Sequence, residues 1–402
     1  MKGIFLSVPS VSVSKTLTLI LDEIAANGYE VIYYNAKDFE PDGNHHFSFR
    51  AYPDKFTGYF AGKMDAHTSY FDFGEILINS AESLIDFLIS EVNIEKPDFI
   101  VHSHLAVWGK LIAQHLQIPA VTLYTTFILD KRIMLPFFRK RNEGKHAGYN
   151  HVNEALSFYR KCDSLYTSLQ LDGRLDIWDV YINKGDLNLC FILEHFQHQK
   201  HFFDQEFHFL GYPTPLEKMK REETTIYISM GTVFNAETEI YQLCIDVLND
   251  MEIPSIVSVG SKGKVIKFKN VSKYIRVEEF VEQREVLKGA KLFITSGGMA
   301  SVHEAIYTCT PMIVIPIIPE QQLTAEKIAE LGIGVHIQHQ LVRPKILKEA
   351  ILEVLHNHET YVANLQKLCG SVSETPPEKK AVQLISTFLA NHYQSGANNI
   401  RS

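Results

Sequence analysis

The stretch FITSGGMASVHEA, residues 293–305, sets a double glycine between an apolar run and a segment with helical periodicity. Ser296, Gly297 and Gly298 would let the first N–H groups of that helix approach an anion, because a helix N-terminus carries partial positive charge. Glu304 follows about two turns later, where a carboxylate can accept the hydroxyl groups of a ribose. The stretch predicts a binding site for the diphosphate of a nucleotide. The alternative is an ordinary turn followed by a solvated glutamate.

Two other strand-like runs end in residues of related chemistry. Ser229, Gly231 and Thr232 stand in ISMGTVFN, where small polar residues beside a glycine let backbone N–H groups reach an anion. In EEFVEQREVL, Phe280 offers a ring for stacking on a base, and Gln283 offers an amide for a base or sugar edge. A tight turn and an ordinary strand end are the alternatives for these segments.

Glu320 and Gln321 are expected in a loop after the strand-like run PMIVIPI. A carboxylate next to an amide suits a polyhydroxylated ligand, because the pair offers both acceptors and donors.

His102 and His104 stand on either side of Ser103 in IVHSHLAVWGK. On an extended strand both imidazoles point the same way, and imidazole is the side chain best suited to accept a proton near neutral pH. We expect either histidine to be able to serve as a general base. The alternatives are satisfied histidines of the core and a metal-binding pair, for which no third ligand stands nearby in the sequence.

Strands and helices must position these residues, and the sequence predicts both. Short apolar runs alternate with helical periodicity, from GIFLSV, KTLTLILDEIAANG and YEVIYYN to PMIVIPI, EKIAELG and GVHI. In the first helical segment, four apolar residues share one face and Gly28 ends the helix; the four are Leu17, Ile20, Leu21 and Ile24. This alternation predicts an α/β fold in which helices cover both faces of parallel sheets.

The length of the chain predicts two domains. Its 402 residues exceed the roughly 250–300 residues that one hydrophobic core supports, and YPTPLEKMKREE has the prolines and charges of an exposed linker. We expect two doubly wound Rossmann-like domains that face a cleft. The expected parts are a first domain (1–214), a linker (215–223), a second domain (224–375), a helix packing back on the first domain (376–395) and a mobile tail (396–402).

The composition argues for some classes of binding partner and against others. A formal net charge of −8 argues against nucleic acid as a partner. The five cysteines include no C-x-x-C pair, which favours reduced thiols in a cytoplasmic protein. No apolar stretch reaches the roughly 20 residues of a membrane span. IMLPFFRKRNEGKH combines apolar residues with Arg139, Lys140 and Arg141, which suits weak contact with a membrane surface or an anionic acceptor; a solvated loop is the alternative. Nothing in the sequence indicates the oligomeric state.

The order and spacing of these segments resemble family 1 glycosyltransferases, closest to the bacterial macrolide- and antibiotic-type UDP-glycosyltransferases of two-domain GT-B fold. The strongest resemblance lies in FVEQREVLKGAKLFITSGGMASVHEAIYTCTPMIVIPIIPEQQLTAEKIAELGIG, supported by YISMGTVFN and, in the first half, by EKPDFIVHSHLAVWGKLIAQHLQIPAV and GDLNLCFILEHFQHQKHFFDQEFHFLGYPT. The resemblance implies that the first domain (1–214) is the acceptor-side domain and the second (224–375) the nucleotide-sugar domain, with donor-binding roles for several residues. Base and ribose would meet Phe280, Gln283 and Glu304; the diphosphate would meet Ser229, Thr232, Gly297, Gly298 and Ser301; the sugar would meet Glu320, where the family typically has aspartate, and Gln321.

The resemblance also shows what this chain lacks. The family has a histidine base in the loop after the first strand, which here reads VPSVSVSKTL and places Ser12, or Ser10, at that position. The aspartate that orients the histidine falls at Ser103, and a diphosphate-binding histidine falls at Ser296. Serine has too little basicity to serve as a general base near neutral pH.

We therefore expect a metal-independent, inverting glycosyltransferase that uses a nucleotide-diphosphate sugar, with UDP as the expected nucleotide, and no cofactor. No D-x-D sequence stands in the chain to hold a metal-bound diphosphate. Its acceptor would be small and partly apolar, as aromatics at 47–60 and 70–74 suggest. The base would be atypical: His102 or His104, or none at all with an acceptor such as an acid, a phosphate or an amine. The alternative is a catalytically silent protein that binds a nucleotide sugar, a lipid or a partner enzyme.

Overall fold

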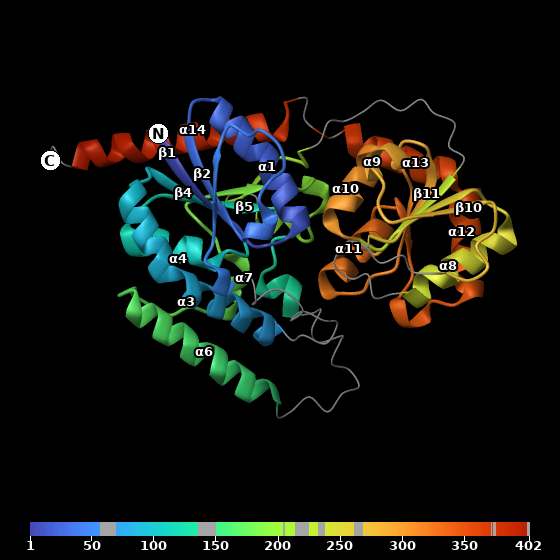
Figure 1. Ribbon diagram of the computed structural model, residues 1–402, viewed down its shortest axis with the longest axis horizontal. Coiled ribbons are helices and arrows are strands. Elements are labelled where there is room, and N and C mark those ends of the chain that lie inside the picture. The colour runs from blue at the N-terminus through green and yellow to red at the C-terminus, as the bar shows by residue number, and fades with distance from the viewer. Residues whose placement is uncertain are drawn as a thin grey trace. The chain divides into compact units, whose positions relative to one another are not determined.

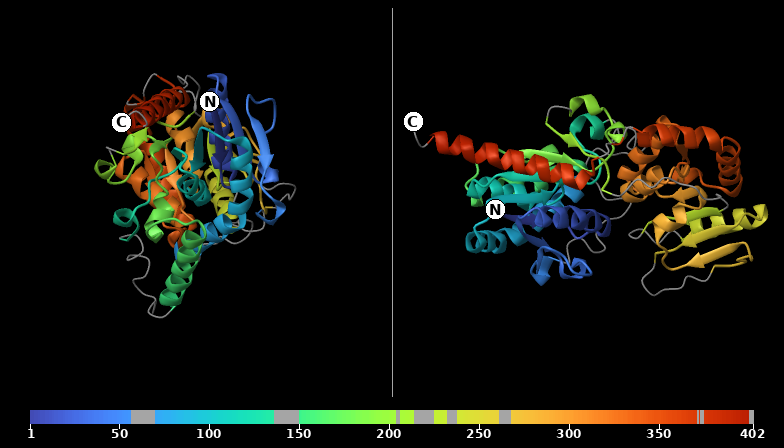
Figure 2. Two further views of the ribbon diagram at one scale, coloured as in Figure 1. Left: turned by 90° about the vertical axis from the view of Figure 1, so that its left-hand side faces the viewer. Right: turned by 90° about the horizontal axis from the view of Figure 1, so that it is seen from above.

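The computed structural model describes residues 1–56, 70–135, 150–203, 206–213, 225–231, 238–260, 268–370, 372 and 375–399. The chain forms two compact units, and each contains one parallel sheet flanked by helices (Figures 1 and 2). Unit 1 comprises Met1–Pro213 and Glu374–Ser402, and unit 2 comprises Thr214–Ser373. The predicted pair of doubly wound α/β domains is confirmed.

The sheet of unit 1 has seven strands in the order β3-β2-β1-β4-β5-β6-β7, all parallel. The strands are β1 (Lys2–Leu6), β2 (Glu30–Asn35), β3 (Ser48–Ala51), β4 (Phe99–Ser103), β5 (Ala120–Tyr124), β6 (Leu187–Cys190) and β7 (His208–Phe209). The helices are α1 (Val11–Ala26), α3 (Tyr70–Glu95), α4 (Val107–Leu116), α6 (Asn150–Ser168), α7 (Ile177–Ile182) and α14 (Pro377–Asn399). Short 3₁₀ turns span Lys37–Phe39, Asp54–Phe56, Glu194–Phe196 and Lys200–Phe202.

Helix α1 shows how the sequence pattern produces this packing. The four residues predicted to share one face are all buried: Leu17, Ile20, Leu21 and Ile24. The helix ends at Ala26, and Gly28 then takes a φ of +88°, a left-handed conformation that glycine adopts without the steric cost of a Cβ.

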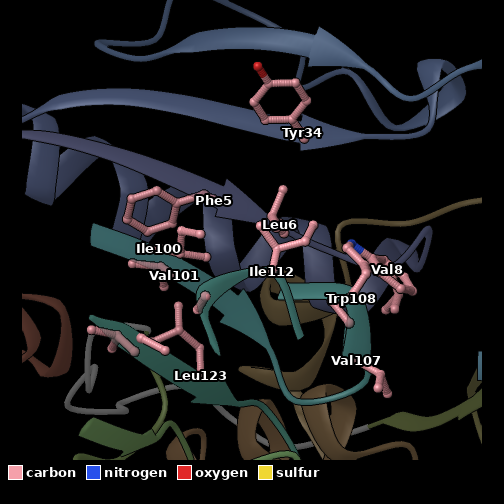
Figure 3. Close-up of a cluster of buried hydrophobic side chains, with 14 of the residues drawn as sticks. Phe5, Leu6, Val8, Tyr34, Ile100, Val101, Val107, Trp108, Ile112 and Leu123 are labelled. Carbon is pink, nitrogen blue, oxygen red and sulfur yellow. The ribbon is translucent and has the colours of Figure 1, made fainter. Parts of the chain in front are cut away.

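Both faces of the sheet in unit 1 are covered. On one face, the Tyr33 and Asn35 side chains of β2 lie 3.5 and 3.0 Å from the Ser14 hydroxyl of α1. On the other, Figure 3 shows Leu6 beside Trp108 and Ile112 of α4, all fully buried. Because side chains alternate along a strand, each strand packs against helices on both faces of the sheet.

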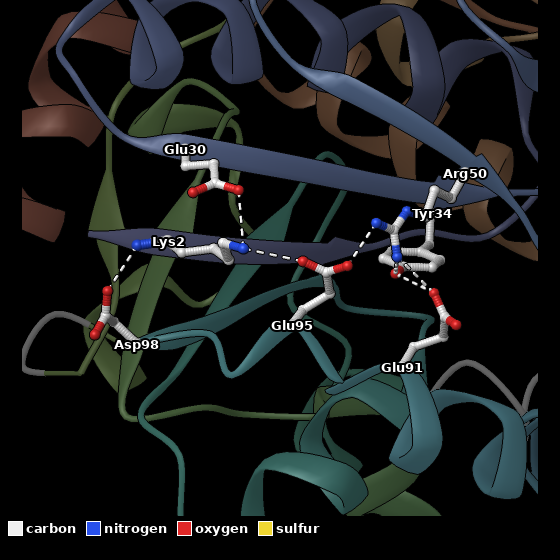
Figure 4. Close-up of polar contacts among 7 residues, drawn as sticks. All are labelled: Lys2, Glu30, Tyr34, Arg50, Glu91, Glu95 and Asp98. Carbon is white, nitrogen blue, oxygen red and sulfur yellow. Dashed lines mark hydrogen bonds and ion pairs between the residues drawn. The ribbon is translucent and has the colours of Figure 1, made fainter. Parts of the chain in front are cut away.

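An ion-pair network ties the strands to α3 (Figure 4). The Lys2 ammonium lies 2.9 Å from Glu95, and the Arg50 guanidinium lies 2.8 Å from Glu91 and 2.5 Å from Glu95. Hydrogen bonds from these two cations lower the pKa of the Glu95 carboxyl.

Helix α14 belongs to unit 1 although it ends the chain. It packs along α1, the hydroxyls of Tyr29 and Ser386 lie 2.7 Å apart, and the Tyr393 hydroxyl donates to the Asp98 carbonyl at 2.7 Å.

The sheet of unit 2 has six parallel strands in the order β10-β9-β8-β11-β12-β13. They are β8 (Thr225–Ser229), β9 (Ser255–Ser258), β10 (Ile275–Glu278), β11 (Ala290–Thr295), β12 (Met312–Val314) and β13 (Gly334–His336). The helices are α8 (Thr238–Met251), α9 (Gln283–Leu287), α10 (Met299–Tyr307), α11 (Pro319–Glu330), α12 (Pro344–His356) and α13 (His358–Gly370), with a 3₁₀ turn at His339–Leu341. Among the described residues, no helix has both the length and the apolar character that crossing a membrane requires.

Candidate functional site

The junction of β11 and α10 has the strand–glycine–helix geometry that the sequence predicts. Gly297 has a φ of +89°, and a Cβ at this position would lie 2.7 Å from the Val314 side chain, so only glycine fits. Gly298 is the N-cap of α10 with a φ of −61°, and a Cβ there would meet no atom within 4 Å. A glycine N-cap brings no side chain to the first N–H groups of α10, which leaves them to a ligand or to water.

Ser296 joins three segments of unit 2. Its hydroxyl donates to the Met230 carbonyl at 3.0 Å, just after β8, and accepts a hydrogen bond from the Gln321 amide at 3.2 Å. The side chain is buried. The serine therefore holds the ends of β8 and β11 and the start of α11 together.

The expectation that Glu320 and Gln321 lie in a loop is wrong, because both lie in the first turn of α11. Pro319 takes the first helical position, where its fixed φ favours helix. The side-chain carbonyl of Gln321 accepts hydrogen bonds from the N–H groups of Ile317 and Ile318 at 2.8 and 3.2 Å, which satisfies donors at the helix start. The Gln321 side chain is 7% exposed, so it serves the fold of this turn.

Three predicted residues from different elements meet at Gln283. Its amide donates to the Ser301 hydroxyl at 3.0 Å and to the Glu304 carboxylate at 2.7 Å. Both acceptors lie on α10, whereas Gln283 begins α9. The structure thus brings together an amide, a hydroxyl and a carboxylate one to two turns from the N-terminus of α10.

Tyr227 is a member of this group that sequence reasoning missed. Its hydroxyl donates to the side-chain carbonyl of Gln283 at 3.4 Å, and its ring stacks on Phe293 with centroids 4.9 Å apart. Burial raises the pKa of Tyr227 to about 12, so the phenol stays a neutral donor. In the sequence Tyr227 is one residue of an ordinary apolar strand, and only the fold reveals its partner.

The remaining donor-side candidates differ in how much of them the structure describes. Phe280 follows β10 and is 68% exposed, which leaves its ring free for stacking. Ser229 ends β8 and is buried, and Gly231 has a φ of +85°. Thr232 lies outside the described residues.

His102 does not support its predicted role as a base. It is 1% exposed, its Nε2 lies 3.2 Å from the Thr122 hydroxyl, and its Cβ lies so close to Gly109 that a Cβ on that glycine would be 2.4 Å away. Burial lowers its pKa to about 3. A buried imidazole of such low basicity is a core residue, which was the alternative.

His104 is buried in the same way. It is 3% exposed, its ring stacks on Tyr124 at 5.5 Å, and burial lowers its pKa to about 4. Its main-chain carbonyl accepts a hydrogen bond from the Asn183 amide at 2.8 Å. Asn183, which sequence reasoning missed, takes the left-handed conformation at the end of α7, and its own carbonyl accepts from Thr122 at 3.1 Å. It therefore fixes the end of β4 against β5.

The serines on the acceptor side are described to different extents. Ser103, the last residue of β4, is 1% exposed, and its hydroxyl has no hydrogen-bond partner. Ser12 lies in the first turn of α1, and its side chain is outside the described residues, as are Arg139, Lys140 and Arg141. Within the described ranges, no group of three or more His, Cys, Asp or Glu side chains gathers as a metal site would require.

Comparison with known proteins gives matches along nearly the whole chain. The model of the Erythromycin biosynthesis protein CIII-like C-terminal domain matches residues 243–387. An uncharacterized UDP-glucosyltransferase of Bacillus subtilis, YojK, is 28% identical over 392 residues, 94% of either chain. The NDP-glycosyltransferase YjiC of the same organism is 28% identical over 395 residues, again 94% of either chain.

Solved structures agree with the fold. The glycotransferase of kitacinnamycin superposes with a TM-score of 0.79 at 20% identity, covering 96% of this chain and 99% of that one. The family model and the bacterial relatives support a family 1 glycosyltransferase, and the structural likeness shows the GT-B fold.

Proposed function

We propose that the protein transfers a sugar from a nucleotide-diphosphate sugar to a small, partly apolar acceptor, without metal and with inversion at the anomeric carbon. Relatives described as a UDP-glucosyltransferase and an NDP-glycosyltransferase support the donor class. The structural likeness to the glycotransferase of kitacinnamycin supports a natural-product-like acceptor.

The observation that carries the proposal is the group formed by Gln283, Ser301 and Glu304 beside the N-terminus of α10. The Glu304 carboxylate can accept the ribose hydroxyls because a carboxylate has several acceptor sites. Its hydrogen bond from the Gln283 amide, 2.7 Å long, would be shared with the ribose or shifted when the donor binds. The uncapped N-terminus of α10 can hold the diphosphate by its N–H groups and its dipole.

The other donor contacts follow from this placement. The exposed ring of Phe280 stacks on the base, and Ser229, Gly231, Thr232, Gly297 and Gly298 surround the diphosphate. Developing negative charge on the leaving group is stabilised by preorganised N–H groups, which need no metal. Glu320 holds the transferred sugar, and Gln321 acts mainly by holding the turn that carries Glu320.

Calorimetry with UDP, UDP-glucose and a dTDP-sugar, paired with an assay of donor hydrolysis, tests the proposal. We expect UDP and at least one sugar nucleotide to bind, with turnover of the sugar nucleotide. Absence of binding by every nucleotide would contradict the donor site itself.

The burial of His102 and His104 favours a second function. With neither histidine exposed to act as a base, the protein would bind a nucleotide sugar without transferring the sugar, and would bind a lipid or a partner enzyme instead. Binding with neither hydrolysis nor transfer in the same assays would favour this function over the first.

A further inference from the structure

The carboxyl ends of β1 and β4 form the topological switch point of the sheet in unit 1. These strands are neighbours, and the strand order runs away from them in opposite directions, β1-β2-β3 and β4-β5-β6-β7. Open α/β sheets bind ligands at such a reversal. Two helices begin here, α1 with 16 residues and α4 with 10, and neither has an acidic residue in its first turn. Both N-termini therefore favour negative charge.

Ser103 lies at this place with an unsatisfied hydroxyl. It is the last residue of β4, it is 1% exposed, and its Oγ has no hydrogen-bond partner. A buried hydroxyl without a partner is destabilising, and native structures rarely keep one unless water or a ligand supplies the bond. The orphaned hydroxyl is an observation independent of the helix termini.

The Ser103 side chain points to the side of the sheet where α1 begins. His102 packs against Gly109 of α4, so alternation turns Ser103 to the opposite face. Strand register shows which elements cover that face. Val101, two residues before Ser103, pairs with Phe5, and Phe5 pairs with Tyr33. The Tyr33 hydroxyl reaches the α1 residue Ser14, so α1 covers this face.

The sequence around the site carries no negative charge. Residues 1–21, which include β1 and the first part of α1, contain no aspartate or glutamate, and neither do residues 99–129, which include β4, α4 and β5. An anionic group meets no carboxylate from these elements. An ammonium group would meet two helix N-termini, which disfavour it.

Among the described residues, neither histidine predicted as a base is exposed at this switch point. The segment VPSVSVSKTL after β1, predicted as a loop, instead begins α1 at Val11. It contains no histidine, aspartate or glutamate, and His102 and His104 are buried in the core. We propose that unit 1 binds its acceptor through an anionic oxygen, a carboxylate or a phosphate monoester, at the carboxyl ends of β1 and β4. This inference rests on the proposed function, because the anion is the acceptor of that transfer.

An anionic acceptor removes the need for a base. One of its oxygens forms a bond to the anomeric carbon of the sugar, while the bond from that carbon to the diphosphate oxygen breaks and the electron pair leaves with the nucleoside diphosphate. No proton has to be removed, so a carboxylate yields a glycosyl ester and a phosphate monoester yields a glycosyl phosphodiester, together with the free nucleoside diphosphate. An alcohol acceptor would need a general base in the transition state.

A matched set of acceptors tests the proposal on the full chain. With UDP-glucose as donor, benzoate, phenyl phosphate and benzyl alcohol are compared at neutral pH by mass spectrometry of the products. We expect transfer to benzoate or to phenyl phosphate, and at least tenfold less to benzyl alcohol; the two anions distinguish a carboxylate acceptor from a phosphate acceptor. Equal or preferred transfer to benzyl alcohol would overturn the inference and leave the proposed function standing.

Ser103→Ala tests the hydroxyl, since a lost hydrogen bond to a charged group corresponds to roughly a ten- to hundredfold loss in kcat/KM for the anion. Ser103→Thr should retain most of the rate. Ser80→Ala is the control: Ser80 is equally buried in unit 1, and its hydroxyl donates to the Ile76 carbonyl at 2.7 Å within α3. Loss of rate in the control alone, or in neither variant, would contradict a role for Ser103.

Calorimetry with UDP, and separately with each anion, distinguishes failure of the proposed function from failure of the anion site. Failure of UDP to bind would refute the proposed function, whereas benzoate or phenyl phosphate binding that weakens in Ser103→Ala would still support the anion site. If neither anion binds, or if both bind as well to Ser103→Ala as to the unaltered chain, the hydroxyl is served only by an ordered water and the inference is refuted.

Discussion

Alanine substitution at the two adjacent glycines of unit 2 should separate folding from donor binding. Gly297→Ala puts a Cβ into a left-handed conformation and 2.7 Å from the Val314 side chain. The backbone strain costs about 1–2 kcal/mol and the overpacking about 1–3 kcal/mol. We expect the free energy of unfolding of unit 2 to fall by about 2–5 kcal/mol in total.

Gly298→Ala is the matched substitution, one residue along. Its φ of −61° suits any residue, and the added Cβ meets no atom within 4 Å. Loss of a glycine N-cap in favour of alanine costs about 1 kcal/mol or less. The methyl group would, however, stand where a diphosphate approaches the N-terminus of α10, so UDP affinity should fall by at least tenfold.

Urea unfolding and calorimetry with UDP measure the two effects on the same variants. Gly297→Ala should lose stability, and Gly298→Ala should lose UDP affinity with its stability nearly unchanged. Unchanged UDP affinity in Gly298→Ala would refute the placement of the diphosphate at this helix N-terminus. Equal loss of stability in both variants would refute the reading of the two glycine conformations.

Three further predictions address the network and the buried histidines. Gln283→Ala should weaken UDP binding by roughly threefold to tenfold, as expected for one or two neutral hydrogen bonds, while Gln242→Ala, which removes an exposed amide of α8, should leave calorimetric affinity unchanged. Gln321→Met should weaken UDP-glucose more than UDP, because Gln321 holds the turn at Ile317 and Ile318 that carries Glu320; equal weakening of both ligands would contradict a role of this turn in holding the sugar. Burial lowers the pKa of His303 to about 4, close to that of His104 and above that of His102. The unfolded state therefore binds protons that the folded state does not as pH falls below about 6.5. The free energy of unfolding should drop by on the order of 3 kcal/mol per histidine between pH 6.5 and 4, and His303→Gln should reduce the slope in the transition of unit 2; a slope unchanged in that variant would contradict the burial effect.

The sequence predicts the fold well because the fold depends on local periodicity. The apolar face of α1, the stop at Gly28 and the alternation of strands and helices each follow from spacing within a short window. The glycine pair after β11 is predictable for the same reason, since a strand, two glycines and a helix are adjacent in the chain.

The errors arise where a side chain's role depends on packing and hydrogen bonds that residue spacing alone does not reveal. Alternation predicts that His102 and His104 point the same way, but not that Gly109 and Tyr124 lie on that side and bury them. The position of Gln321 after the strand-like run PMIVIPI predicts a loop. Its hydrogen bonds to Ile317 and Ile318, together with Pro319 at the first position, begin a helix instead.

The two described serines that stand where the family has charged or titratable residues are in opposite situations. Ser296 has two hydrogen bonds and links β8, β11 and α11, so its hydroxyl is satisfied within unit 2. Ser103 has no partner although it is as deeply buried. A substitution that the fold has absorbed leaves no unsatisfied group, whereas one that awaits a ligand does. The Ser296 hydroxyl is therefore satisfied by the chain itself, and under our proposal the hydrogen-bond partner of Ser103 comes from the molecule that binds there.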